Sequence, residues 1–100
     1  MILDEEASRA VVAYLGKGTS SWPRADVGAA MEAATVTDPG RLASATAALV
    51  EECLGITVDW LSVSLSEGGD QVREEMARRH PQLGPSALEA LRWAFTYHWR

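Results

Sequence analysis

Apolar and polar residues alternate along most of the chain at the spacing of α-helices, and residues 86–100 show this most clearly. On a helix, one side of this segment is formed by Leu88, Leu91, Phe95 and Trp99, with alanines beside it. The opposite side carries Trp93 and Tyr97, and the remaining polar strip holds Glu89, Arg92, Thr96 and Arg100. Because a surface helix is usually apolar on one face only, the pattern predicts a helix at the centre of the fold, or one between the fold and a partner.

Two further segments combine an apolar stripe with signals for both helix ends. Residues 4–15 begin with Asp4, a favoured N-cap residue, and are followed directly by a glycine. Residues 38–54 begin with Asp38 as the N-cap and a proline in the first turn, and Gly55 stands at the C′ position. We expect a helix over each segment.

A shorter helix is predicted over residues 23–35. Pro23 suits a first helical turn, where its missing N–H has no intrahelical partner to lose. Gly28 lowers the stability of this helix by ~1 kcal/mol relative to alanine. A β-branched run at 35–37 is expected to end it.

The glycine pair at 68–69 predicts a break in the chain. After the break, Asp70 is expected to cap a short helix that ends before Pro81. Ser86 and Glu89 have the spacing of a capping box, which predicts the start of the aromatic C-terminal helix.

Residues 56–66 fit two structures. The apolar residues alternate with polar ones as in a strand, but Val58, Leu61 and Leu65 also have helical spacing. No second run resembles a strand, and an isolated strand is not stable. We therefore expect a helix over about 58–66, with a strand over 56–65, paired across a homodimer, as the main alternative.

Together these segments predict an all-α fold, a single compact helical domain over residues 1–100 with five or six short helices. The aromatic C-terminal helix is expected to be central, with the helices over 4–15 and 38–54 packed against it. A length of 100 residues is typical of one domain. The content of 47% hydrophobic and 23% charged residues is typical of a globular chain.

The net charge of −5 is unevenly distributed, since residues 1–70 carry 11 acidic and 4 basic side chains. No apolar run approaches the ~20 residues of a membrane span, and the start lacks the basic region of a secretory signal. Cys53 is the single cysteine and has no internal disulfide partner, as is typical of the reducing cytoplasm. We expect an acidic cytoplasmic protein without a membrane partner, and its excess of arginine over lysine suggests a bacterial, GC-rich genome.

No residue pattern indicates a catalytic site, a cofactor or a metal ion. Cys53, His80 and His98 do not have the spacing of a metal site. Cys53 falls on an apolar helix stripe, where a free cysteine usually behaves as a small hydrophobe, and His98 is expected in the core or at its rim. Neighbouring carboxylates such as Glu51 and Glu52 point in different directions on a helix, so they do not form an acid–base couple. We therefore predict that the protein is not an enzyme.

Residues Leu54-Gly55-Ile56-Thr57-Val58-Asp59-Trp60-Leu61 resemble the turn that follows the recognition helix in helix-turn-helix domains of the phage-repressor type. The resemblance covers this segment alone and implies a helix that starts near Thr57. A DNA-associated regulator is thus an alternative function, although the acidity of residues 1–70 opposes phosphate contacts. The candidates for a small basic patch are Arg73, Arg78, Arg79 and Arg92.

The leading hypothesis is a small acidic helical protein that acts by binding another protein, as immunity, antitoxin and adaptor proteins do. The chain has more large aromatic residues than one small core buries, and tryptophan and tyrosine are frequent interface anchors. The candidate interface residues are Trp22, Trp93, Tyr97, Trp99 and Arg100. A homodimer without a separate partner, paired through the helix over 86–100, is the other alternative, and nucleic acid is not an expected partner.

Overall fold

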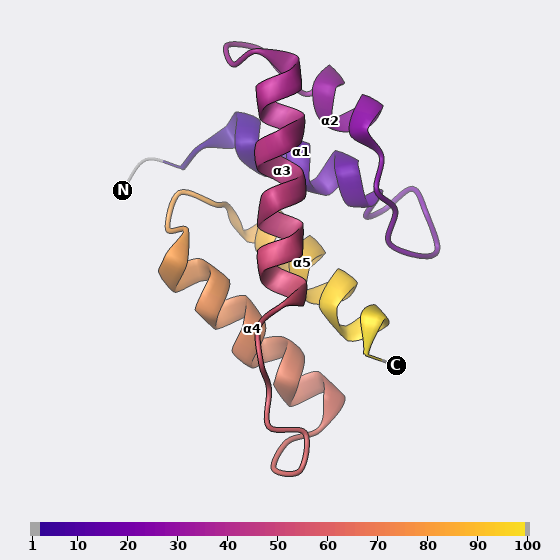
Figure 1. Ribbon diagram of the computed structural model, residues 1–100, viewed down its shortest axis with the longest axis vertical. Coiled ribbons are helices and arrows are strands. Elements are labelled where there is room, and N and C mark those ends of the chain that lie inside the picture. The colour runs from indigo at the N-terminus through magenta and orange to yellow at the C-terminus, as the bar shows by residue number, and fades with distance from the viewer. Residues whose placement is uncertain (1–2, 100) are drawn as a thin grey trace.

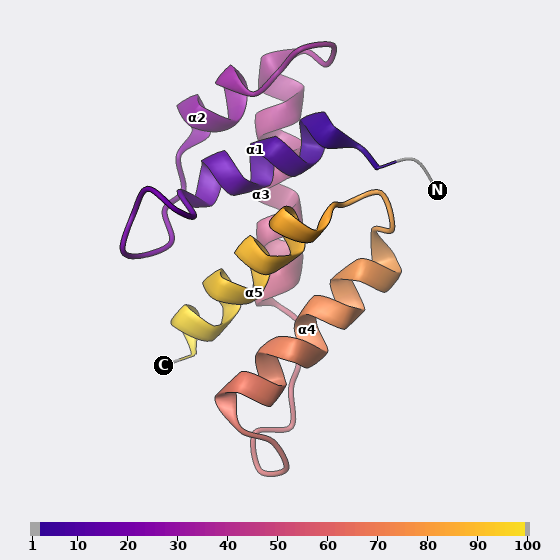
Figure 2. The ribbon, with the colours of Figure 1, turned by 180° about the vertical axis from the view of Figure 1, so that it is seen from behind.

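The computed structural model describes residues 3–99, which form five helices (Figure 1). The helices are α1 (Glu5–Leu15), α2 (Val27–Glu32), α3 (Pro39–Leu54), α4 (Leu65–Arg79) and α5 (Pro85–His98). Seen from behind, α1 and α5 cross in front of α3, and α4 lies beside α5 (Figure 2). The predicted all-α bundle is confirmed. Among residues 3–99 no strand forms, and only an isolated bridge joins Lys17 and Ser20.

The two segments with strong capping signals form helices close to the predicted bounds. The side chain of Asp4 accepts a hydrogen bond from the backbone of Ala7, and Gly16 ends α1 in the left-handed conformation with φ of 75°. Asp38 caps α3 in the same way as Asp4 caps α1. Gly55 differs from the expected left-handed C′ glycine, because its φ of −85° is right-handed.

The second helix is shorter than predicted and starts at Val27 instead of Pro23. The reason is that the preceding residues are bonded to the end of α1. Arg24 donates a backbone hydrogen bond to Leu15, and Asp26 donates one to Tyr14. These bonds hold residues 23–26 away from helical geometry, and Asp26 then caps α2.

The prediction of a helix over 58–66 is wrong, and so is the alternative of a strand over 56–65. Residues 56–64 form a loop in which the carboxylate of Asp59 accepts hydrogen bonds from the Leu61 backbone and the Ser62 hydroxyl, and helix begins only at Leu65. Such local side-chain bonds offer the backbone an alternative to helix. The helix that the helix-turn-helix resemblance implied at Thr57 is therefore absent.

The expected break at Gly68 and Gly69 is also wrong, because both glycines lie within α4. The helix starts at Leu65, where Ser64 and Glu67 form a complete capping box, and Asp70 is an internal residue instead of a cap. The end before Pro81 is as predicted. The capping box satisfies two backbone donors at the helix start, which helps α4 to begin ahead of two poor helix formers.

The two glycines permit close contact with neighbouring elements. A Cβ atom on Gly68 would lie 2.5 Å from the ring of Trp60, and one on Gly69 would lie 2.5 Å from the methyl group of Thr96 in α5. Both glycines are buried. Their role is thus to bring the backbone of α4 against the Trp60 loop and α5.

The C-terminal helix occupies the central position that the sequence predicted, since it contacts α1, α3 and α4. It starts at Pro85 with Gly84 as the N-cap, so the predicted capping box at Ser86 does not form. The buried side is formed by Ala87, Ala90, Leu91, Ala94 and Phe95. The polar strip faces α4: Arg92 pairs with Asp70 at 2.9 Å and Glu89 pairs with Arg73 at 2.9 Å.

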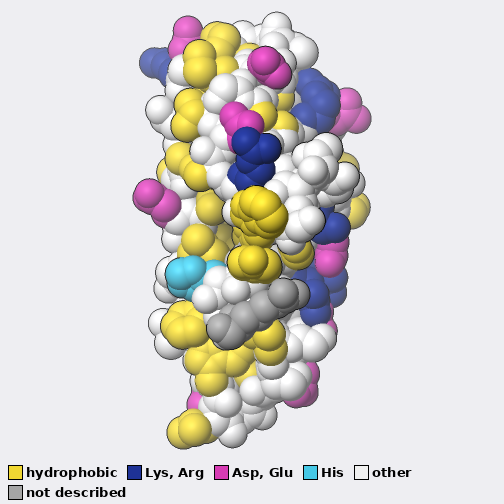
Figure 3. All heavy atoms as spheres, turned by 90° about the vertical axis from the view of Figure 1, so that its right-hand side faces the viewer, with side chains coloured by type: hydrophobic (Ala, Val, Ile, Leu, Met, Phe, Trp, Pro, Cys, Tyr) yellow, Lys and Arg dark blue, Asp and Glu magenta, His cyan; other side chains and the backbone are white. Residues whose placement is uncertain are grey.

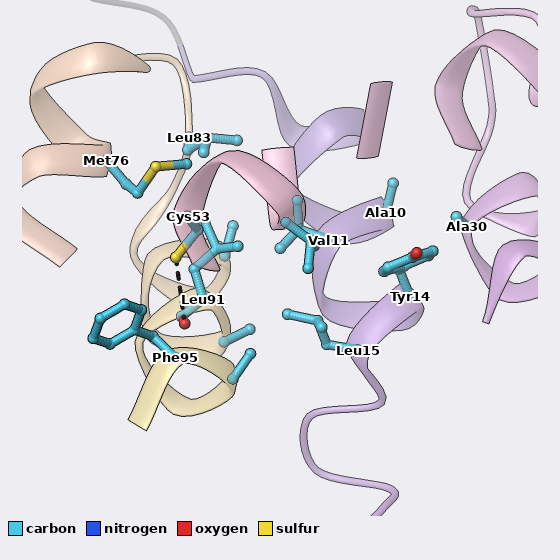
Figure 4. Packing of buried hydrophobic residues seen from close by; sticks show 14 of the residues in the cluster. Ala10, Val11, Tyr14, Leu15, Ala30, Cys53, Met76, Leu83, Leu91 and Phe95 are labelled. Atoms are coloured by element: carbon cyan, nitrogen blue, oxygen red, sulfur yellow. Dashed lines mark hydrogen bonds between the residues drawn. The ribbon is translucent and has the colours of Figure 1, made fainter. Parts of the chain in front are cut away.

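In the core, residues from α1, α3, α4 and α5 meet around Leu91 and Phe95 (Figure 4). Leu91 and Phe95 of α5 lie beside Cys53 of α3, and Met76 of α4 approaches from the other side. Val11 contributes the α1 side of the same cluster. No described side-chain nitrogen or oxygen is buried without a hydrogen-bond partner. In residues 3–99, no helix has both the length and the apolar character that a bilayer span requires.

Replacement of Gly68 by alanine is expected to destabilise the protein by about 1–3 kcal/mol, because the new methyl group overlaps the Trp60 ring in a packed region. The control is Gly28→Ala, where the new Cβ atom makes only an ordinary contact and alanine is the better helix former. That variant should be neutral or up to about 1 kcal/mol more stable. Urea denaturation of both variants measures the difference, and equal stabilities would contradict the close-approach role of Gly68.

Candidate functional site

The structure places the predicted interface residues in different environments. Trp22, Tyr97 and Trp99 are 58%, 39% and 47% exposed, whereas Trp93 is half-buried against the core. Arg100 lies outside the described residues. Exposed large aromatic side chains are thus present, as the interface hypothesis requires, but they do not form one contiguous set.

An aromatic cluster forms where the end of α5 meets the loop before α4. The ring centroid of Trp60 lies 5.9 Å from that of Phe95 and 5.6 Å from that of Trp99, distances typical of attractive aromatic pairs. Phe95 is fully buried, while Trp99 is open to solvent. Leu61 follows Trp60 in the chain and is fully exposed. We call Trp60, Leu61 and Trp99, the members that solvent reaches, the aromatic edge.

The molecular surface on this side is rich in apolar side chains. Figure 3 shows hydrophobic side chains gathered in an interrupted band down the face that carries the C-terminal end of α5. Acidic and basic side chains lie beside the lower part of this band and interrupt it in its upper half. The lower part of the band, with apolar side chains inside and charged ones beside it, resembles the apolar centre and polar rim of protein interfaces.

Trp93 and Trp22 do not belong to the aromatic edge. The Trp93 ring lies on another side of α5, with the ammonium group of Lys17 5.7 Å from its centroid, within the range of a cation–π contact. Trp22 belongs to the loop between α1 and α2, where its backbone bonds to Ser20. Of the predicted tryptophans, only Trp99 takes part in the ring contacts of the cluster.

A second surface feature is an open groove of about 870 Å³ across the outer side of α1. Its apolar lining comes from α1, α2 and the start of α5, and includes Val12, Ala29 and Pro85. Arg9, Lys17 and two glutamates also line it. Because both charge signs are present, the groove does not specify the charge of an occupant.

The four arginines that the sequence suggested as a basic patch are all paired with carboxylates. Arg73 binds Asp70 and Glu89, and Arg92 also binds Asp70. Arg78 and Arg79 share Glu75, and Arg79 reaches Glu52 of α3 at 3.1 Å. These arginines connect helices to one another, and their charges are locally balanced.

The cysteine and the histidines have structural surroundings. Burial, with a smaller contribution from the charge of Glu52, raises the pKa of the Cys53 thiol to about 12, and its sulfur lies 3.7 Å from the Leu91 carbonyl oxygen. His80 lies 2.8 Å from Glu52, and hydrogen bonds from His80 and Arg79 lower the pKa of Glu52. His98 is exposed, with its ring edge-on to Trp99, so it lies at the rim instead of in the core. Within residues 3–99, no three His, Cys, Asp or Glu side chains are grouped to hold a metal ion.

Glu6 makes the densest set of polar contacts to a distant part of the chain. Its carboxylate accepts hydrogen bonds from the backbone N–H groups of Thr35, Val36 and Thr37, and from both threonine hydroxyls. These bonds lower the pKa of Glu6 far below the usual value of 4.5. Glu6 thereby ties α1 to the connection between α2 and α3.

Sequence reasoning missed Trp60, Leu61 and Glu6. Trp60 and Leu61 were expected within a helix over 58–66, although an aspartate such as Asp59 can form a turn by bonding to the backbone two residues further on, as it does here with Leu61. In the sequence, Glu6 looked like one of several solvated glutamates. No local pattern connects it with Thr35, Val36 and Thr37, which follow 29 to 31 positions later in the chain. No protein family, curated protein or solved structure matches the chain.

Cys53 is expected to resist thiol reagents in the folded protein. At pH 8 a thiol with a pKa of about 12 reacts on the order of a thousandfold more slowly than an ordinary cysteine, because the thiolate is the nucleophile. The measurement is the labelling rate with and without denaturant. The control is a Ser44→Cys, Cys53→Ala variant, which exposes a thiol on α3 and should label quickly; rapid labelling of native Cys53 would contradict its burial.

Glu6→Gln is expected to lower stability at pH 7. Because folding depresses the pKa of Glu6, its carboxylate stabilises the folded state above about pH 4.5. That stabilisation is lost as the pH falls through the folded-state pKa. The difference in the free energy of unfolding between Glu6→Gln and the wild type should therefore become smaller between pH 7 and pH 3. Urea denaturation over this range measures it. Glu5→Gln, which lacks such contacts among the described residues, is the control, and a deficit independent of pH would contradict the assignment.

Proposed function

We propose that this protein acts by binding another protein through the aromatic edge formed by Trp60, Leu61 and Trp99. The observation that carries the proposal is that Leu61 is fully exposed directly after Trp60, whose ring contacts that of Trp99, a residue that is 47% exposed. A large aliphatic side chain in that position contributes nothing to the core. Contiguous exposed apolar residues with a polar border are typical of protein interaction sites.

The aromatic edge is also suited to binding because it is held in place before any partner arrives. Trp60 stacks on buried Phe95 and packs against the backbone of α4 at Gly68. The Asp59 turn fixes the loop that carries Leu61. Side chains that are already ordered lose little conformational entropy on binding, so more of the contact energy appears as affinity.

The charge distribution favours a basic partner. The net charge is −5, and the arginines of α4, together with Arg92 of α5, are already paired with carboxylates of the same chain. Complementary charge accelerates association and selects among partners. The same pairing argues against a DNA-associated regulator, because unpaired cations are needed for phosphate contacts. A bacterial, cytoplasmic setting and a non-catalytic role are part of the proposal.

Light scattering after size exclusion, over a series of protein concentrations, is the first test. For a dimer, the aromatic edge is tested as the contact between two copies of the chain, and for a monomer it is tested as the contact with a different protein, sought by capture from the native host. In either case, Leu61→Ser should weaken the association by about tenfold or more, as expected for an interface anchor. Trp99→Ala should act in the same direction.

Val36→Ser is the matched control for Leu61→Ser. Val36 is also an almost fully exposed aliphatic residue, and it lies at the opposite end of the molecule, between α2 and α3 (Figure 1). The proposal predicts that the control binds like the wild type. If Leu61→Ser and Trp99→Ala leave every association unchanged while the chain stays folded, the aromatic edge is not the interface.

A further inference from the structure

The turn at residues 35–37 has the donor arrangement of an oxyanion receptor. Three consecutive backbone N–H groups point at one oxygen of the Glu6 carboxylate, with Val36 at 2.7 Å and Thr37 at 3.1 Å. The hydroxyl of Thr35 donates to the same oxygen, and that of Thr37 donates to the other. Five donors thus surround a single carboxylate. Converging backbone N–H groups of this kind are known anion sites.

The surroundings of the turn leave it accessible to an external ligand. Glu6 and Thr37 line a groove of about 500 Å³ between α1 and α3, and its other charged lining has both signs, with Arg41 and His80 beside Asp4 and Glu52. Among the described residues, the Arg41 guanidinium has no carboxylate partner, in contrast to the arginines of α4. The turn itself is exposed, with Val36 92% accessible, so an external anion reaches it without a rearrangement of the core.

We propose that the turn Thr35–Thr37 is an oxyanion-binding site that the free chain fills with its own Glu6 carboxylate. An external carboxylate or phosphate competes with Glu6 for the same donors. Because Glu6 is part of α1, its carboxylate is always near the turn. An external anion can bind only when Glu6 has left the turn, so the apparent affinity for that anion falls as the occupancy of the turn by Glu6 rises. Occupancy of Glu6 above about nine-tenths reduces that affinity tenfold or more.

The exchange has a structural consequence. Glu6 joins α1 to the connection between α2 and α3 across about thirty positions of sequence. An external anion that takes the turn releases α1 from this connection while keeping the turn itself satisfied. The site is therefore distinct from the aromatic edge, and its test does not depend on the identity of a protein partner.

The experiment compares the wild type with Glu6→Ala by NMR titration of the backbone amides. The probes are sodium acetate and inorganic phosphate, with sodium chloride at equal ionic strength as the reference. In Glu6→Ala, the amides of residues 35–37 should shift saturably with acetate or phosphate, and at least about tenfold more tightly than in the wild type. Comparison of the two probes distinguishes a carboxylate site from a phosphate site.

Thermal unfolding of the same samples gives a second readout. A ligand that binds only the folded state raises the melting temperature, so acetate or phosphate should restore part of the stability that Glu6→Ala loses, even if the variant is partly unfolded. Glu5→Ala, at the neighbouring position on α1, should show neither effect. If Glu6→Ala shows no saturable shift at 35–37 and no anion-dependent stabilisation beyond that of chloride, the proposal is overturned. Equal effects in Glu5→Ala would overturn it as well.

Discussion

The close approach of α4 to α5 and to the Trp60 loop is the constraint on which much of the structure depends. Gly68 and Gly69 make it possible, because a Cβ atom at either position would overlap a neighbouring side chain. At this distance Arg92 reaches Asp70 and the Ser66 backbone, and Arg73 reaches Glu89. The polar strip of α5 is thereby satisfied by α4, and its apolar sides are left for α1, α3 and the aromatic cluster.

The same contact determines which apolar residues remain outside. Trp60 is held between the backbone of α4 and the ring of Phe95, so it directs the following residue, Leu61, into solvent. Trp99 completes the cluster from the end of α5. Packing inside and exposure outside are thus two results of one arrangement.

The charged residues divide into two groups with different roles. Those of α4 and α5 join helices through pairs such as Arg92–Asp70, and these exposed or half-buried pairs each contribute modestly to stability. Glu6 instead binds a backbone turn far away in sequence, where several donors act on one carboxylate. The two proposed sites therefore lie at opposite ends of the molecule and rely on different chemistry, apolar contact at one end and hydrogen-bond donation at the other.

The sequence by itself determined the helices whose signals are local. α1 and α3 follow from an apolar stripe and an aspartate cap, and the all-round apolar pattern of α5 placed it correctly at the centre. Only the tertiary structure decided the meaning of Gly68 and Gly69, the loop at 56–64 and the role of Glu6. The physical reason is that each depends on a partner distant in sequence. A glycine pair is a break in isolation but a contact surface when another helix packs on it, and a solvated glutamate becomes a ligand when a turn supplies its donors.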